Sequence, residues 1–228
     1  MNSTLLQIAS KSVQEATEIA GSSIFEIISG IGITGQVIMT IIFLLSIYSI
    51  YIFVERYFTI KKAGVLDKNF MNRVKDFVSN GNIEGAKDWC RKEDTPIAHL
   101  IGKGVSRIGK SMKDISATIE NQGNLEIQKM EKGLVALATI SGAAPMLGFL
   151  GTVTGMITTF KDIADGNTAA NEMAGGLYEA MFTTAFGLAA GLIAYVAYNM
   201  LTGMIDKVIF KIEDSSVDFI DLLSEPSR

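Results

Sequence analysis

The chain has 228 residues, of which 48% are hydrophobic and 19% charged, with a net charge of −4 and a mean hydropathy of +0.32. Few prolines, abundant glycine and long uncharged runs are typical of helical membrane proteins and disfavour a soluble globular domain. Nucleic acid is not an expected partner, because the most basic segment, residues 55–133, carries 11 acids beside its 15 Lys and Arg.

One cysteine and one histidine limit the available chemistry. Cys90 has no partner for a disulfide within the chain, which favours a reducing compartment for its segment. His99 is not part of a Cys/His cluster, so no metal site and no cofactor are expected. The first residues do not resemble a cleavable signal peptide, because they lack a basic start and acids interrupt them.

The N-terminal 28 residues have a modestly amphipathic pattern. Apolar residues recur at three-to-four-residue spacing in residues 3–28, with Lys11, Glu15 and Glu18 elsewhere. We predict a periplasmic helix over residues 1–28 that lies at the membrane surface. The alternative is a frayed terminus with no role.

Three segments are long and apolar enough to cross a hydrocarbon core of about 30 Å. We predict spans over 29–54, 133–160 and 173–205, joined by a cytoplasmic segment 55–132 and a periplasmic loop 161–172. The first span is rich in Ile, Leu, Phe and Tyr, and Arg56, Lys61 and Lys62 follow it. The positive-inside rule then places the N-terminus outside and the C-terminus inside.

The predicted cytoplasmic segment has the pattern of short helices. Helical spacing covers Leu66–Val78 and Ile83–Arg91, and Thr95-Pro96 supplies a cap and a first residue for a third helix. A helix that begins near Asp114 is predicted to run into the second span. The third span is predicted to continue as an amphipathic cytoplasmic helix over 206–228. No stretch has the alternation of a sheet, so the predicted fold is an all-α membrane protein.

A nucleotide-binding pattern occurs at Gly104–Ser111, which matches GxxxxGK[ST]. A phosphate-binding loop of this type follows a buried strand. Thr95–Lys103 has the pattern of a capped helix instead, and no later apolar run ends in an Asp suited to magnesium. We therefore interpret the motif as a basic loop between helices, and we do not expect an enzyme.

The second and third spans are crowded with small and hydroxyl-bearing residues. Pro145, Gly148, Thr152, Gly155 and Thr159 follow one another at spacings of three or four, and Gly151/Gly155 and Gly187/Gly191 form GxxxG pairs. This composition is typical of helices that pack tightly or line a passage. Each Thr has an alternative role, in which its hydroxyl binds a carbonyl of its own helix. Pro145 is expected to kink or open the second span.

Glu179 is the one acid inside the predicted third span. An ionisable group within a membrane is costly unless it faces a partner or water, which makes it a functional candidate. Its position, roughly 9 Å from the start of the span by helical rise, also suits an acid that reaches the interface.

Two motifs on these spans resemble the proton-channel family of ExbB, TolQ and MotA. Ala144–Met156, with the sequence APMLGFLGTVTGM, resembles the family pattern AP-x-LG-LGTV-GM, and Glu179–Leu188, EAMFTTAFGL, resembles EAL-x-TA-x-GL. Three spans favour ExbB or TolQ over the four-span MotA. The family pattern favours Thr184 over the adjacent Thr183 as the lumen residue, whereas the spacing alone leaves this open.

This resemblance implies a homopentamer in the bacterial inner membrane, whose second and third spans line a pore around two copies of an ExbD- or TolR-like partner. The partner's intramembrane Asp would carry the proton. Thr152, Thr184, Thr183 and Glu179 would form the polar wall, and Pro145, Gly148, Gly151, Gly155 and Gly187 would allow close packing. An ExbB-like subunit would use the proton motive force to energise a TonB-type transducer for outer-membrane transport. The alternatives are a TolQ-like subunit that acts on TolA, a gliding-type stator, and a purely structural cage.

Overall fold

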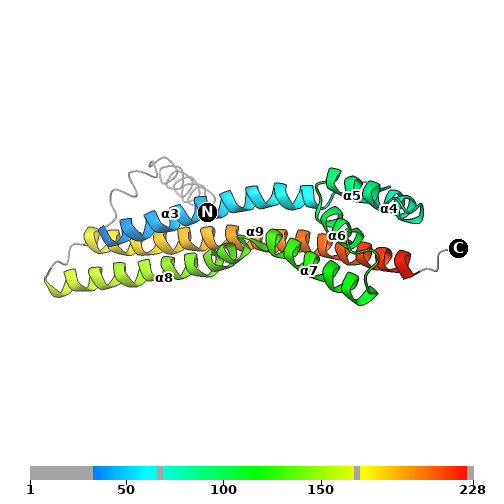
Figure 1. The fold of residues 1–228 in the computed structure, drawn as a ribbon. Coiled ribbons are helices and arrows are strands. Elements are labelled where there is room, and N and C mark those ends of the chain that lie inside the picture. The colour runs from blue at the N-terminus through cyan, green and yellow to red at the C-terminus, as the bar shows by residue number, and fades with distance from the viewer. Residues whose placement is uncertain (1–32, 66–68, 167–169, 225–228) are drawn as a thin grey trace, which may run out of the picture. The chain divides into compact units, whose positions relative to one another are not determined.

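The computed structural model describes residues 33–65, 69–166 and 170–224, which form helices and no strand (Figure 1). The predicted all-α fold is therefore confirmed for these residues. The predicted surface helix over 1–28 lies outside them. The helices are α3 (Ile33–Ala63), α4 (Phe70–Ser79), α5 (Ile83–Lys92), α6 (Pro96–Val105), α7 (Met112–Glu131), α8 (Leu134–Ala164) and α9 (Ala170–Ser224).

Within the described residues, three helical stretches are long and apolar enough to cross a membrane. They are Ile33–Ala63, Met112–Ala164 and Ala174–Ser224. The predicted span 133–160 lies within the second stretch, and the predicted spans 29–54 and 173–205 overlap the first and third. At 1.5 Å per residue, α8 alone has a length of about 46 Å, which exceeds the hydrocarbon thickness.

The chain divides into two compact units. The first, here called the hairpin unit, contains the described part of residues 1–46 together with Gly142–Gly191. The second, here called the helical unit, contains Ile47–Ser141 and Leu192–Arg228. Each of α3, α8 and α9 contributes residues to both units.

The helical unit has its own apolar core. Helix α4 packs on α5, α5 on α6 and α6 on α7, and the C-terminal part of α9 adds side chains to the same cluster. Phe219 of α9 is fully buried and lies beside Gly104 of α6. A Cβ atom on Gly104 would lie 2.6 Å from the Phe219 ring, so glycine is required for this contact.

Two of the short helices, α5 and α6, begin where the sequence indicates, whereas the helix predicted over Leu66–Val78 is observed as α4 from Phe70. The Thr95 hydroxyl accepts a hydrogen bond from the Ala98 N–H, and Pro96 occupies the first helical turn, where its missing N–H costs nothing. Asn82 caps α5 in the same way. The predicted starts at Ile83 and Thr95-Pro96 are confirmed.

The predicted continuous helix from Asp114 into the second span is wrong. Helix α7 ends at Glu131 and α8 begins at Leu134, and Gly133 between them has φ +89°. Only glycine adopts this region without strain, and a right-handed helix does not pass through it. The apolar periodicity on both sides conceals the break.

The third span does continue without interruption, as predicted. Helix α9 extends from Ala170 to Ser224. The loop before it is shorter than the predicted range 161–172, because α8 persists to Ala164 and turns at Gly166 with φ +89°.

Candidate functional site

In the hairpin unit, α8 and α9 approach each other so closely that backbone meets backbone (Figure 1). A Cβ atom on Gly187 would lie 2.7 Å from the Ala144 carbonyl oxygen and 2.8 Å from the Gly148 Cα. A Cβ atom on Gly148 would lie 3.0 Å from the Thr184 Cα. No larger residue fits at either position unless the helices separate.

The same close approach continues toward the loop. Gly151 faces Thr183, and a Cβ atom on this glycine would lie 2.7 Å from the Thr183 Cβ. One turn further, a Cβ atom on Gly155 would lie 2.9 Å from the Ala180 Cβ. The small residues therefore form one continuous antiparallel contact, as the composition of the spans indicated.

Thr183 and Thr184 have different surroundings. The Thr183 side chain is fully buried in the gap left by Gly151, and its hydroxyl donates to the Ala180 carbonyl at 2.8 Å. The Thr184 side chain is half-buried, and its hydroxyl donates across the pair to the Gly148 carbonyl at 2.8 Å. Thr183 is thus enclosed between the helices, whereas Thr184 keeps an accessible side.

Thr152 is also half-buried, and its hydroxyl donates to the Phe149 carbonyl of its own helix at 2.6 Å. Thr159 is buried and donates to the Gly155 carbonyl at 3.0 Å. The alternative in which each hydroxyl binds its own helix is therefore correct for Thr152, Thr159 and Thr183. It is not correct for Thr184, which joins the two helices.

Pro145 and Glu179 complete the set of predicted residues. Helix α8 is continuous through Pro145, whose side chain is half-buried. Because proline has no N–H, the Ser141 carbonyl loses its usual partner four residues on. Glu179 belongs to α9, and its side chain lies outside the described residues.

The sequence reasoning missed three small residues that form the contact: Ala144, Ala180 and Gly176. The signal was present, because contact positions 144, 148, 151 and 155 in α8 repeat the spacing of 176, 180, 183 and 187 in α9. Two helices with the same four-three-four pattern of small residues can pack antiparallel along their whole length.

The nucleotide-binding pattern does not form a phosphate site. Gly104 lies in α6, so the motif follows a helix and not a strand. Ser111 caps α7, and its hydroxyl donates to the Asp114 carboxylate at 2.7 Å. The interpretation as a loop between helices agrees with this geometry.

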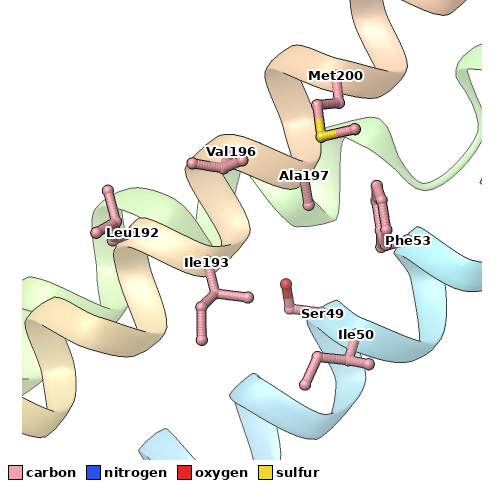
Figure 2. Close-up of a pocket in the computed structure, with 8 residues that line it drawn as sticks. All are labelled: Ser49, Ile50, Phe53, Leu192, Ile193, Val196, Ala197 and Met200. Carbon is pink, nitrogen blue, oxygen red and sulfur yellow. The ribbon is translucent and has the colours of Figure 1, made fainter.

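An apolar groove lies in the helical unit between α3 and α9, with a volume of about 410 Å³ (Figure 2). Ser49 points from α3 toward α9, and its buried hydroxyl has no hydrogen-bond partner. The rest of the lining is Ile50, Phe53, Leu192, Ile193, Val196, Ala197 and Met200. A groove without a titratable group has no means to bind and release protons.

A network of charged side chains also lies in the helical unit. The two ring nitrogens of His99 lie 3.1 Å from an Asp94 oxygen and 3.4 Å from a Glu126 oxygen. The same Glu126 oxygen accepts from Lys129 at 2.8 Å and from Gln122 at 2.8 Å. This network joins α6 to α7, and it lies outside the hairpin unit that carries the motifs.

Three helical stretches that could cross a membrane, and a close glycine-mediated contact between two of them, are typical of a multi-pass membrane protein. The profile of the MotA/TolQ/ExbB proton channel family matches residues 92–214, more than half of the chain. The chain belongs to this family, whose members are proton channels and not enzymes. The matched range contains Gly142–Gly191, the part of the hairpin unit that carries the two motifs.

Curated relatives carry the names ExbB and TolQ. A putative biopolymer transport protein ExbB homolog of Methanothermobacter thermautotrophicus is 30% identical over 79% of this chain and 64% of its own length. The biopolymer transport protein ExbB of Xanthomonas campestris is 34% identical over 45% of this chain and 41% of its own. The Tol-Pal system protein TolQ of Haemophilus influenzae is 35% identical over 43% of this chain and 42% of its own length. The chain thus spans less than two thirds of these relatives.

A solved structure has the same fold. The structure of C. jejuni MotAB includes a chain that is 16% identical to this one, with a TM-score of 0.51, and the match covers 97% of this chain and 86% of that one. At this identity the likeness shows the fold alone.

Proposed function

We propose that this chain is the wall-forming subunit of a motor driven by the proton motive force. Five copies surround two copies of a single-span partner of the ExbD or TolR type, and the partner's intramembrane Asp carries the proton. The complex energises a TonB-type transducer for outer-membrane transport. The names of the ExbB relatives favour this pathway, and a TolQ-like role with TolA is the alternative that the TolQ relative supports.

One observation carries this proposal. In a family of proton channels, the hairpin holds Thr152 and Thr184 half-buried on a helix pair that glycines bring into backbone contact. Hydroxyl groups on a rigid scaffold are suited to line a passage, because the close packing fixes their positions. Thr152 and Thr184 are therefore the proposed wall residues. Thr183 is better suited to packing, because Gly151 encloses it.

The proposed orientation has the N-terminus outside and the C-terminus in the cytoplasm of the bacterial inner membrane. It is supported by the basic residues that follow the first span, of which Lys61 and Lys62 lie in the last turn of α3. Glu179 then lies near the outer end of the third span, at the entrance of the proposed path.

The test is proton flux in vesicles that contain this chain together with its partner. Thr152→Val and Thr184→Val each replace a hydroxyl by a methyl of similar size. We expect proton flux to fall at least about tenfold in each variant, because the path loses a hydrogen-bonding group in a region with little water. Assembly with the partner is expected to persist.

The matched control is Thr158→Val, an exposed threonine on α8 whose hydroxyl binds the Thr154 carbonyl. This variant is expected to conduct normally. Undiminished flux in both Thr152→Val and Thr184→Val would reject the proposed wall and favour a structural cage, in which bulk at the glycines matters more than the hydroxyls.

A further inference from the structure

Every threonine that the structure describes within residues 142–191 donates its hydroxyl proton to a backbone carbonyl. Six side chains do so, namely Thr152, Thr154, Thr158, Thr159, Thr183 and Thr184. The donor in each bond is certain on chemical grounds, because a carbonyl oxygen has no proton to give.

A hydroxyl group has one proton and two acceptor lone pairs. When its proton is committed, it presents only acceptors to whatever approaches its open side. Thr152 and Thr184 are the two proposed wall residues with an open side, and their hydroxyl-to-carbonyl distances are 2.6 and 2.8 Å. The Thr152 distance is shorter than the usual O–H···O value of about 2.7–2.8 Å and the Thr184 distance matches it, so each proton is committed to a carbonyl.

The Thr184 bond is also part of the helix contact. It ties α9 to the Gly148 carbonyl at the point where the two backbones meet. To turn its proton outward, Thr184 would have to give up the bond that joins the helices. The close packing therefore fixes the polarity of this hydroxyl as well as its position.

From this geometry we infer that the threonine wall accepts hydrogen bonds and does not donate them, so that it binds a protonated carboxylic acid and rejects the carboxylate. A protonated acid donates its O–H to an open Thr lone pair. A carboxylate has acceptors only and finds no donor at Thr152 or Thr184, which makes its burial there costly. The wall thus distinguishes the two protonation states of the acid that faces it.

This inference rests on the proposed function, because it takes the partner's intramembrane Asp as the group that meets the wall. It adds a direction to that role. The protonated Asp side chain is held at the threonines, and the ionised side chain is released from them toward water. Selection of one state is what a motor needs to convert proton binding into movement.

The test compares how firmly the assembled chain retains three forms of its partner, with Asp, Asn or Ala at the intramembrane position. Asn has N–H donors and no charge at any pH, so it represents the protonated acid, whereas Ala has neither donor nor charge. Retention is measured as the rate at which unlabelled partner displaces labelled partner from the purified complex at pH 5 and pH 8.

We expect the Asn form to be displaced about fivefold more slowly than the Ala form at both pH values, the factor that one neutral hydrogen bond contributes. The Asp form should be held more firmly at pH 5 than at pH 8. A combined Thr152→Val and Thr184→Val variant should remove the advantage of Asn, and Thr158→Val should preserve it.

Equal displacement of the Asn and Ala forms, or firmer retention of the Asp form at pH 8, would overturn the inference. Proton flux measured on the same complexes separates this result from a failure of the proposed function. If proton flux falls in the Thr→Val variants but the Asn form is displaced as fast as the Ala form, Thr152 and Thr184 line the path and their acceptor-only character is wrong. If flux is unchanged, the proposed wall itself is wrong.

Discussion

Thr183 and Thr184 are neighbours in the chain, and successive residues of a helix point in directions about 100° apart. One of them fills the gap opposite Gly151, and the other reaches the Gly148 carbonyl and keeps an open side. The family pattern favoured Thr184, but the spacing alone could not separate these roles, because both residues are Thr and they are adjacent in the chain. The separation depends on the register of two helices, which the contacts reveal.

Cys90 allows a prediction about reactivity. Its side chain is buried in the helical unit, and this burial raises the pKa of the thiol to about 11, because a thiolate is poorly stabilised without water. Thiolate is the reactive form, so at pH 8 we expect maleimide labelling roughly a hundredfold slower than for an exposed cysteine. The measurement is the labelling rate of the folded protein followed by mass spectrometry.

The sign of the pH dependence follows from the raised pKa. Labelling should accelerate as the pH rises toward 11, and the native state should lose stability above pH 9, where the unfolded chain releases a proton that the folded chain retains. Denaturation provides the control, since it should bring the rate to that of a free thiol. Fast labelling of the native protein at pH 7 would show that Cys90 is exposed.

At the scale of elements, the contact between α8 and α9 depends on missing side chains. We predict that Gly151→Ala destabilises the hairpin by about 1–3 kcal/mol, because the new methyl would lie 2.7 Å from the Thr183 Cβ and the helices must separate. The measurement is the thermal unfolding midpoint of the purified protein in detergent.

Gly142→Ala is the matched control on the same helix. No atom lies within 4 Å of a Cβ at this position, and alanine favours the helix, so stability should be unchanged or slightly higher. If both variants unfold at the same temperature, the α8–α9 contact is looser than the structure indicates.

The elements that the sequence predicted well have local causes. The helix start at Thr95-Pro96 follows from a capping side chain and a proline in the first turn, and both act within four residues. The break at Gly133 could not be predicted in this way. A helix tolerates glycine, and only the positive φ at this residue distinguishes a turn from a continued helix.

At the scale of the whole molecule, the proposed motor needs a proton carrier besides the wall that we assign to this chain. Glu179 is the one acid in the three predicted spans, and no basic residue stands in the second or third span to act with it. In the proposed function, the free energy of about 2.3 kcal/mol that 100 mV supplies per proton acts on the titratable group of the single-span partner. This division of labour agrees with membership of a family that includes ExbB and TolQ.

The most direct measurement is the rate of voltage-driven proton uptake into vesicles that contain this chain alone, compared with vesicles that contain the chain and its single-span partner. The account predicts that the chain alone conducts no faster than empty vesicles and that the partner raises the rate at least about tenfold, since the partner brings the acid that is protonated and released. Rapid uptake by the chain alone would contradict it and would place the proton carrier in this chain.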